Sequence, residues 1–189
     1  MSWISEFEIG IWNAWIFIIP LLVVWISGIK FFFSKRMPDV TPPSKREDKI
    51  LSNLSVIIIF GSFVYSVFLP LKLETIWFYI GLIVYFVGLV VIAETLLNFS
   101  ATPINKPVTN GIYRYSRNPM FIGWFLLYFG ITIITLSWVY LLLTVFLIFI
   151  TVYLSPYEEA ITLQHYGDPY KEYLEKTPRW IGFPREKKK

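Results

Sequence analysis

Apolar residues in this chain gather into long, nearly unbroken runs that are separated by polar segments. Runs of about 20 apolar residues are typical of helices that cross a bilayer, because the hydrocarbon core is about 30 Å thick. The first three runs predict membrane spans at residues 11–33, 50–71 and 76–97. Pro20 lies inside the first run, and membrane helices tolerate proline where neighbouring groups satisfy the freed carbonyl.

The apolar run from Pro119 to Leu154 is too long for one span. As a single helix it would measure about 54 Å, at about 1.5 Å per residue. We therefore predict two short spans, 119–136 and 138–154, with a reversal near Ser137. Together the runs predict an all-α integral membrane bundle of about five transmembrane helices. We expect one domain over residues 1–189, with a polar C-terminal tail.

Composition and charge support this interpretation and give the bundle a direction. The chain is 56% hydrophobic and only 16% charged, whereas soluble domains are about a quarter charged. With the N-terminus outside, sixteen of the 17 lysine and arginine residues fall in cytosolic segments, and only Lys72 falls outside. Basic residues favour the cytosolic side of membrane proteins. The basic pI of about 9.2 is therefore explained by an anionic lipid surface, and we expect no nucleic-acid partner.

Several classes of site are excluded or disfavoured by residue usage. The chain has no cysteine, which excludes disulfides, cysteine nucleophiles and thiolate metal sites. Its one histidine, His165, leaves little room for a metal site, and we predict none. Glu6 and Glu8 precede the first run where a signal peptide would carry basic residues. We therefore expect that run to be a retained anchor.

Two polar clusters flank the last pair of predicted spans and face the same, cytosolic side. One is "NGIYRYSRNPMFIG", residues 110–123, and the other lies within residues 155–184. Acidic side chains at a membrane helix end are costly unless they face water, a partner or a ligand. Glu158 and Glu159 point about 100° apart on a helix, so one can meet an arginine while the other meets a ligand. The residues alone leave open that Arg114 and Arg117 only anchor a loop to lipid headgroups.

The stretch "GIYRYSRNPMFIG", the glutamate pair and the later "YGDPYKEYLEKTPRW" resemble the motifs of a superfamily of membrane methyltransferases. It comprises the isoprenylcysteine carboxyl methyltransferases and the phospholipid methyltransferases. The resemblance covers roughly residues 94–184 and implies an S-adenosylmethionine-dependent enzyme that methylates a lipid or prenylated small molecule. It implies cofactor contacts for the following residues: Tyr113, Arg117, Asn118, Pro119, Met120, Gly123, Glu158, Glu159, Tyr166 and Tyr170.

The resemblance also implies roles for individual side chains. A guanidinium matches a carboxylate bidentately, so Arg117 or Arg114 would hold the methionine carboxylate. Glu158 or Glu159 would hold the ammonium group or a ribose hydroxyl, and tyrosines would wall the adenine. Catalytic roles are expected for these residues: Arg117, Asn118 and Glu159. Acceptor contacts are expected for Arg179 and Glu94.

Asn118 stands where the carboxyl-methylating branch usually has histidine. Asparagine cannot titrate near neutral pH, so it would not act as a general base, and it favours a phospholipid-type amine acceptor. The layout of the tail favours an isoprenylcysteine carboxyl acceptor, which is the leading prediction. Two other classes stay open, a sterol-reductase-like NADPH oxidoreductase and a non-catalytic membrane adaptor. The sequence leaves the oligomeric state open.

Overall fold

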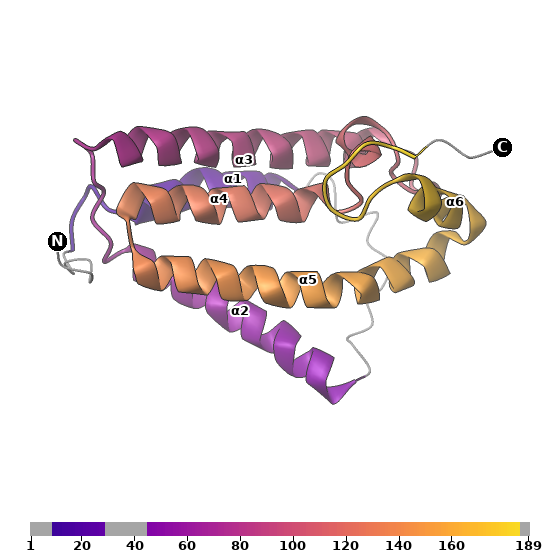
Figure 1. The fold of residues 1–189 in the computed structure, drawn as a ribbon, viewed down its shortest axis with the longest axis horizontal. Coiled ribbons are helices and arrows are strands. Elements are labelled where there is room, and N and C mark those ends of the chain that lie inside the picture. The colour runs from indigo at the N-terminus through magenta and orange to yellow at the C-terminus, as the bar shows by residue number, and fades with distance from the viewer. Residues whose placement is uncertain (1–8, 29–44, 186–189) are drawn as a thin grey trace.

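In the computed structural model the apolar runs form helices that lie alongside one another in a bundle (Figure 1). The structure describes residues 9–28 and 45–185. Within these ranges there is no strand, and an isolated bridge joins Asn13 to Pro70. In chain order the elements are η1 (Ala14–Phe17), α1 (Ile18–Gly28), α2 (Arg46–Ser66), α3 (Ile76–Ala101), η3 (Gly111–Arg114), α4 (Pro119–Thr135), α5 (Trp138–Tyr166) and α6 (Asp168–Lys176).

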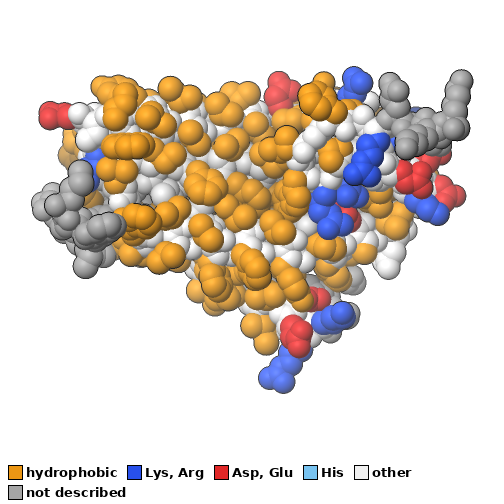
Figure 2. Space-filling model, in the orientation of Figure 1, with side chains coloured by type: hydrophobic (Ala, Val, Ile, Leu, Met, Phe, Trp, Pro, Cys, Tyr) orange, Lys and Arg blue, Asp and Glu red, His pale blue; other side chains and the backbone are white. Residues whose placement is uncertain are grey.

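The bundle has the surface of a membrane protein. Helices α2, α3 and α5 are long and apolar enough to cross a membrane, and two shorter apolar helices accompany them at Ala14–Val24 and Pro119–Thr135. Large apolar side chains stay exposed along the bundle, among them Ile83, Leu142 and Phe149. Figure 2 shows a broad apolar face, with most charged side chains at the end that carries α6 and at the start of α2. Such a surface suits lipid as the surrounding solvent.

The predicted all-α membrane bundle is therefore confirmed. The described part of the first predicted span ends at Gly28, and residues 29–33 lie outside the described residues. Near residues 12–14 the chain is tied to the link between α2 and α3, because the Ala14 backbone N–H donates to Leu69 O at 2.9 Å. The Asn13 amide also donates to Val67 O at 2.7 Å.

The chain reverses between α4 and α5 where the length of the apolar run predicts it. α4 ends at Thr135, and Leu136 adopts a left-handed conformation with φ 51° and ψ 33°. Ser137 then caps α5, its hydroxyl accepting from the Tyr140 backbone N–H at 3.2 Å. Serine is a favoured N-cap because it satisfies a backbone donor that has no partner within the helix.

Helix α5 continues past the predicted span end at Leu154 and stops at Tyr166. Pro156 lies inside it and cannot donate to the carbonyl of Val152. The Ser155 hydroxyl donates to that carbonyl instead, at 3.0 Å. The helix therefore runs on without a break and carries Glu158 and Glu159 out of its apolar portion. The predicted span describes only the apolar part of this helix.

Helices α3 and α4 pack closely along a glycine seam, which we define as Gly81 and Gly88 on α3 with Gly123 and Gly130 on α4. A Cβ at Gly88 would lie 2.9 Å from Gly123 O, and one at Gly130 would lie 2.7 Å from Tyr85 Cβ. Small residues let membrane helices approach this closely. The seam fixes the first turn of α4, and with it the polar residues that precede α4, against α3.

Candidate functional site

A cavity of about 450 Å³ lies where the first turn of α4, the last turns of α5 and helix α6 meet the loop after α3. Small-molecule sites usually measure about 300–1,000 Å³. Nine of its lining residues are ones that the sequence analysis singled out: Tyr113, Arg117, Asn118, Pro119, Met120, Glu158, Glu159, Tyr166 and Tyr170. Segments more than forty residues apart in the chain therefore meet around one space, as the arrangement of α4, α5 and α6 in Figure 1 indicates.

Seven further residues line the cavity and were missed: Phe99, Pro107, Val108, Phe121, Ile161, Thr162 and Tyr173. Helical spacing was a usable signal for some of them. Ile161 and Thr162 lie one turn beyond the two glutamates on α5, and Tyr173 lies one turn beyond Tyr170 on α6. No pattern in the loop after α3 distinguishes Pro107 or Val108 as lining residues.

Three predicted site residues do not line the cavity. Gly123 belongs to the glycine seam, where an added Cβ would lie 2.5 Å from Ile92 Cγ1. Glu94 is exposed on α3. Arg179 lies behind the lining, bound to Glu159. The structure therefore brings Arg179 to the site through another residue and leaves Gly123 and Glu94 outside it.

The turn before α4 is held by local polar contacts. Asn118 is the N-cap residue, and Pro119 occupies the first helical position, where a missing N–H does no harm. The Asn118 backbone N–H donates to the Ser116 hydroxyl at 3.0 Å. Upstream, Gly111 has φ 59°, and a Cβ there would overlap the Asn98 side chain, so only glycine fits.

Helix α6 binds this turn through the hydroxyl of Tyr173. The Tyr173 hydroxyl is buried and lies 2.7 Å from Tyr113 O, to which it donates, and 3.3 Å from Ser116 O. Tyr170 is also buried, and burial raises the pKa of its hydroxyl to about 12. Both rings therefore stay neutral and present apolar faces to the cavity.

Residues 177–185, which we call the closing segment, run back over the turn. Pro178 O accepts from the Arg117 backbone N–H at 3.0 Å, and Tyr115 O accepts from the Gly182 backbone N–H at 3.0 Å. The Asn118 side-chain amide donates to Arg179 O at 3.2 Å. Backbone and side-chain bonds thus lock the closing segment onto the residues that precede α4.

The carboxylate of Glu159 lies at the centre of a buried charge cluster. Arg179 donates to both of its oxygens, from Nε at 3.1 Å and from Nη2 at 2.9 Å. Arg117 Nη1 lies 3.3 Å from Oε2, and the Asn118 amide donates to Oε1 at 3.3 Å. One carboxylate thus faces two guanidinium groups, which leaves the cluster with a positive charge.

The Arg117 side chain has one donor that makes no hydrogen bond within the described residues. Its Nε is buried and has no hydrogen-bond partner within the part of the chain that the structure describes. A buried donor left without a partner is costly. Because Arg117 lines the cavity, a small movement of its guanidinium would bring this donor to a carboxylate bound there, and guanidinium groups suit carboxylates geometrically.

The neighbouring Glu158 has a different environment. Its side chain lines the cavity and lies about one turn beyond the apolar portion of α5. Its side chain is exposed to solvent, and the protein atoms around the carboxyl displace part of its hydration. This partial desolvation raises the pKa of Glu158 to about 7. The two adjacent glutamates thus differ: Glu159 is paired with arginines, and Glu158 faces the cavity.

The remaining lining is aromatic and apolar, with the rings of Phe99, Tyr113, Phe121 and Tyr166 around the space. A site with flat apolar walls, an unsatisfied guanidinium donor and a separate carboxylate fits a ligand that has a planar ring and a zwitterionic end. S-Adenosylmethionine has both features, so the residues present fit the cofactor that the sequence motifs imply.

Comparison with known families supports the same motifs. Residues 76–169 match the family model described as phospholipid methyltransferase. The matched range contains α3, η3, α4 and α5, and it ends just inside α6, before the closing segment. A search of curated proteins found no match for this chain.

Proposed function

This chain is a member of the superfamily of integral membrane methyltransferases that contains the phospholipid and isoprenylcysteine carboxyl enzymes, and we propose that it transfers a methyl group from S-adenosylmethionine to a lipophilic acceptor. The observation that carries this proposal is the cavity beside the start of α4. There Arg117, whose buried Nε has no partner among the described residues, and Glu158 line one space together with aromatic rings.

Arg117 and Glu158 would hold the two charged groups at the amino-acid end of the cofactor. Arg117 would bind the carboxylate through Nε, while its Nη1 keeps the ion pair with Glu159. Glu158 would bind the ammonium group. Tyr166 and Tyr170 would provide walls for the adenine. When bound, S-adenosylmethionine supplies an electrophilic methyl group, whose bond to sulfur breaks as the acceptor's oxygen or nitrogen bonds to it.

Glu159 and Asn118 are positioning residues in this proposal. Both Glu159 oxygens are engaged by arginines, and the Asn118 amide binds Glu159 Oε1 and Arg179 O. Neither side chain is left to accept a proton from an acceptor. The site residues act by orientation and by excluding water, which are large effects in reactions where two groups must meet in line.

Two acceptors are compatible with the family match. Asn118 favours the amine of a phospholipid. The tail layout favours the carboxylate of a prenylated cysteine. Both acceptors are lipophilic and carry an anion at the reacting end, which is the phosphate of the phospholipid or the prenylcysteine carboxylate that is itself methylated. Such an anion suits a cluster with two guanidinium groups around one carboxylate.

The test uses the purified full-length chain in detergent. We expect S-adenosylhomocysteine to raise the thermal unfolding midpoint, because a ligand that binds the folded state stabilises it, and we expect NADPH not to do so. Labelled methyl donor and a lipid extract should give a labelled, organic-soluble product. Alkali releases methanol from a methyl ester and not from a methylated amine, so one hydrolysis step separates the two acceptors. Stabilisation by NADPH alone would support a reductase, and no response to either ligand would support an adaptor.

A further inference from the structure

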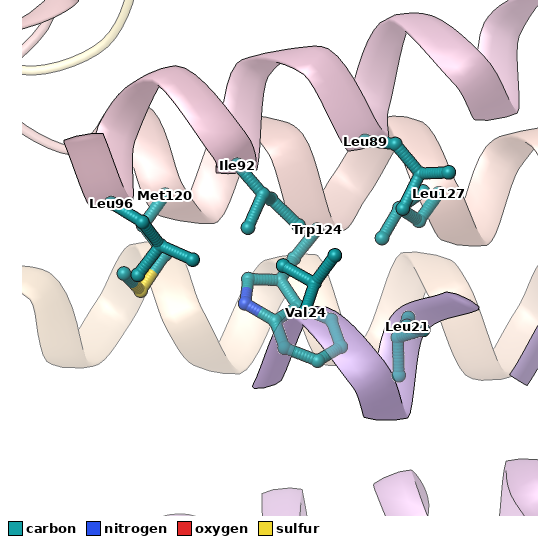
Figure 3. A pocket seen from close by; sticks show the side chains of 8 residues that line it. All are labelled: Leu21, Val24, Leu89, Ile92, Leu96, Met120, Trp124 and Leu127. Atoms are coloured by element: carbon teal, nitrogen blue, oxygen red, sulfur yellow. The ribbon is translucent and has the colours of Figure 1, made fainter. Parts of the chain in front are cut away.

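A second, smaller cavity of about 40 Å³ lies between α1, α3 and α4 (Figure 3). Its lining is entirely apolar apart from the indole nitrogen of Trp124. In Figure 3 the Trp124 ring lies in the middle of this space, with Met120 towards one end and Leu127 towards the other. We call it the α1 groove.

The α1 groove and the larger cavity share one lining residue. Met120, in the first turn of α4, lines both spaces. Met120, Trp124 and Leu127 share one face of α4 and span about 10 Å along it, at about 1.5 Å per residue. The groove therefore extends from Met120, which borders the polar cavity, into the apolar part of the bundle.

Few side chains of α1 pack against the rest of the bundle. Leu21 is the one buried side chain among those described in α1, and Val24 is half-buried beside it. The other described side chains face outwards or lie at the edge, and Val23 is 59% exposed. So narrow a strip of contacts leaves α1 less firmly packed than η1 before it, where Phe17 O accepts from the Tyr85 hydroxyl.

From this geometry we propose that the α1 groove receives the hydrocarbon chain of the methyl acceptor while the acceptor's reactive group lies in the larger cavity. This proposal rests on the function proposed above. A polar part of a ligand would lose its hydration in the groove without gaining hydrogen bonds. A hydrocarbon chain has no hydrogen bonds to lose there. Because the space is smaller than such a chain, entry requires α1 to move aside, and the Val24 and Trp124 side chains limit the room.

The test compares two neighbouring positions on α1. Val24→Trp adds an indole that fills the groove, and Val23→Trp adds the same indole to the exposed side of the helix. With a long-chain acceptor we expect Val24→Trp to raise KM severalfold, because the indole would occupy space that the chain needs. A short-chain acceptor should show little change. S-Adenosylhomocysteine affinity should stay within about twofold of the parent in both variants.

A second measurement does not need turnover. Two photoreactive probes, a phosphatidylethanolamine with a diazirine in its acyl chain and a prenylated cysteine with a diazirine in its prenyl chain, are crosslinked to the full-length protein in detergent. Crosslinks at Leu21, Leu96 or Trp124 that Val24→Trp suppresses and Val23→Trp retains would support the inference. The probe that gives them identifies the kind of chain.

Crosslinks along Phe121 and Ile161, or spread evenly over the outer faces, would overturn the inference, as would equal KM values for the two tryptophan variants. The proposed function fails separately, through absence of S-adenosylhomocysteine binding by the parent protein. If the parent protein binds S-adenosylhomocysteine but the groove residues are not crosslinked, the proposed function stands and the groove has no part in it.

Discussion

At the residue scale the site depends on how Arg117 distributes its donors. Nη1 pairs with Glu159, the backbone N–H binds the closing segment, and the buried Nε has no partner among the described residues. One side chain therefore joins the charge cluster to the space where a ligand would bind. Lysine could replace the ion pair, but it has no second donor at a fixed angle.

We expect Arg117→Lys to separate these two tasks. Folding should be largely preserved, since the positive charge beside Glu159 remains, while S-adenosylhomocysteine binding weakens by about 1–3 kcal/mol, as for a lost charge-assisted hydrogen bond. Isothermal calorimetry measures the affinity. Arg114→Lys is the matched control, because Arg114 is exposed and does not line the cavity. Parent affinity in Arg117→Lys would exclude Nε as a ligand contact.

The raised pKa of Glu158 gives a pH dependence with a definite sign. With its pKa at about 7, Glu158 is mostly neutral at pH 6 and mostly charged at pH 8. A bound ammonium group favours the charged form, so binding must release a proton at low pH. Affinity for S-adenosylhomocysteine should therefore rise by up to about tenfold per pH unit below the pKa and level off above it.

Calorimetry between pH 6 and pH 8 checks this dependence, and Glu158→Gln should flatten it because the amide does not titrate. A profile that is equally steep in Glu158→Gln would assign the titration to another group.

At the residue scale the sequence predicted which residues line the cavity better than it predicted the contacts among them. The span count placed the two motifs on one side of the membrane, and the family resemblance grouped Tyr113, Arg117 and the glutamate pair. It could not show that Arg179 binds Glu159, since a helix end, α6 and a turn separate the two residues. It also placed Gly123 with the cofactor, whereas a glycine beside a polar motif can equally serve helix packing, as it does here.

At the element scale the glycine seam sets the position of α4, and α4 begins at the site. We expect Gly130→Ala to destabilise the protein by about 1–3 kcal/mol, as for overpacking, because the new methyl group would lie 2.7 Å from Tyr85 Cβ and 2.8 Å from Tyr85 backbone atoms. Thermal unfolding in detergent measures the change.

Gly61→Ala on α2 is the control, since a Cβ there meets nothing within 4 Å and alanine favours helix over glycine. Equal unfolding midpoints for the two alanine variants would contradict the close approach of α3 and α4.

The elements themselves were largely predictable, because bilayer thickness limits helix length. That limit predicted a reversal near Ser137, and the left-handed residue of the reversal is Leu136. The continuation of α5 to Tyr166 was not predictable in the same way, because the apolar pattern ends before the helix does. Pro156 added to the difficulty, since the Ser155 bond that replaces its missing donor is visible only in the structure.

At the scale of the whole molecule the charge distribution sets the expected orientation. Figure 2 shows most charged side chains at the end that carries α6, and basic residues favour the cytosol. We therefore expect the site to face the cytosol and the link between α2 and α3 to face outwards.

The absence of native cysteine allows a direct measurement of this orientation. In intact cells a membrane-impermeant maleimide should label Glu74→Cys, whereas Glu175→Cys should react only after the membrane is permeabilised. Both positions are exposed, so access depends on sidedness. The reverse pattern would invert the orientation, and labelling of both from outside would contradict the number of spans between them.

The closing segment has a consequence for biosynthesis. Arg117, Tyr115 and Asn118 are translated long before Pro178, Arg179 and Gly182, to which they bind. A nascent chain that has already inserted α4 into the bilayer therefore still lacks the residues that complete its binding pocket. Only after α5 and α6 have left the ribosome can the late residues reach the early ones, so a ligand cannot be retained by a half-translated chain.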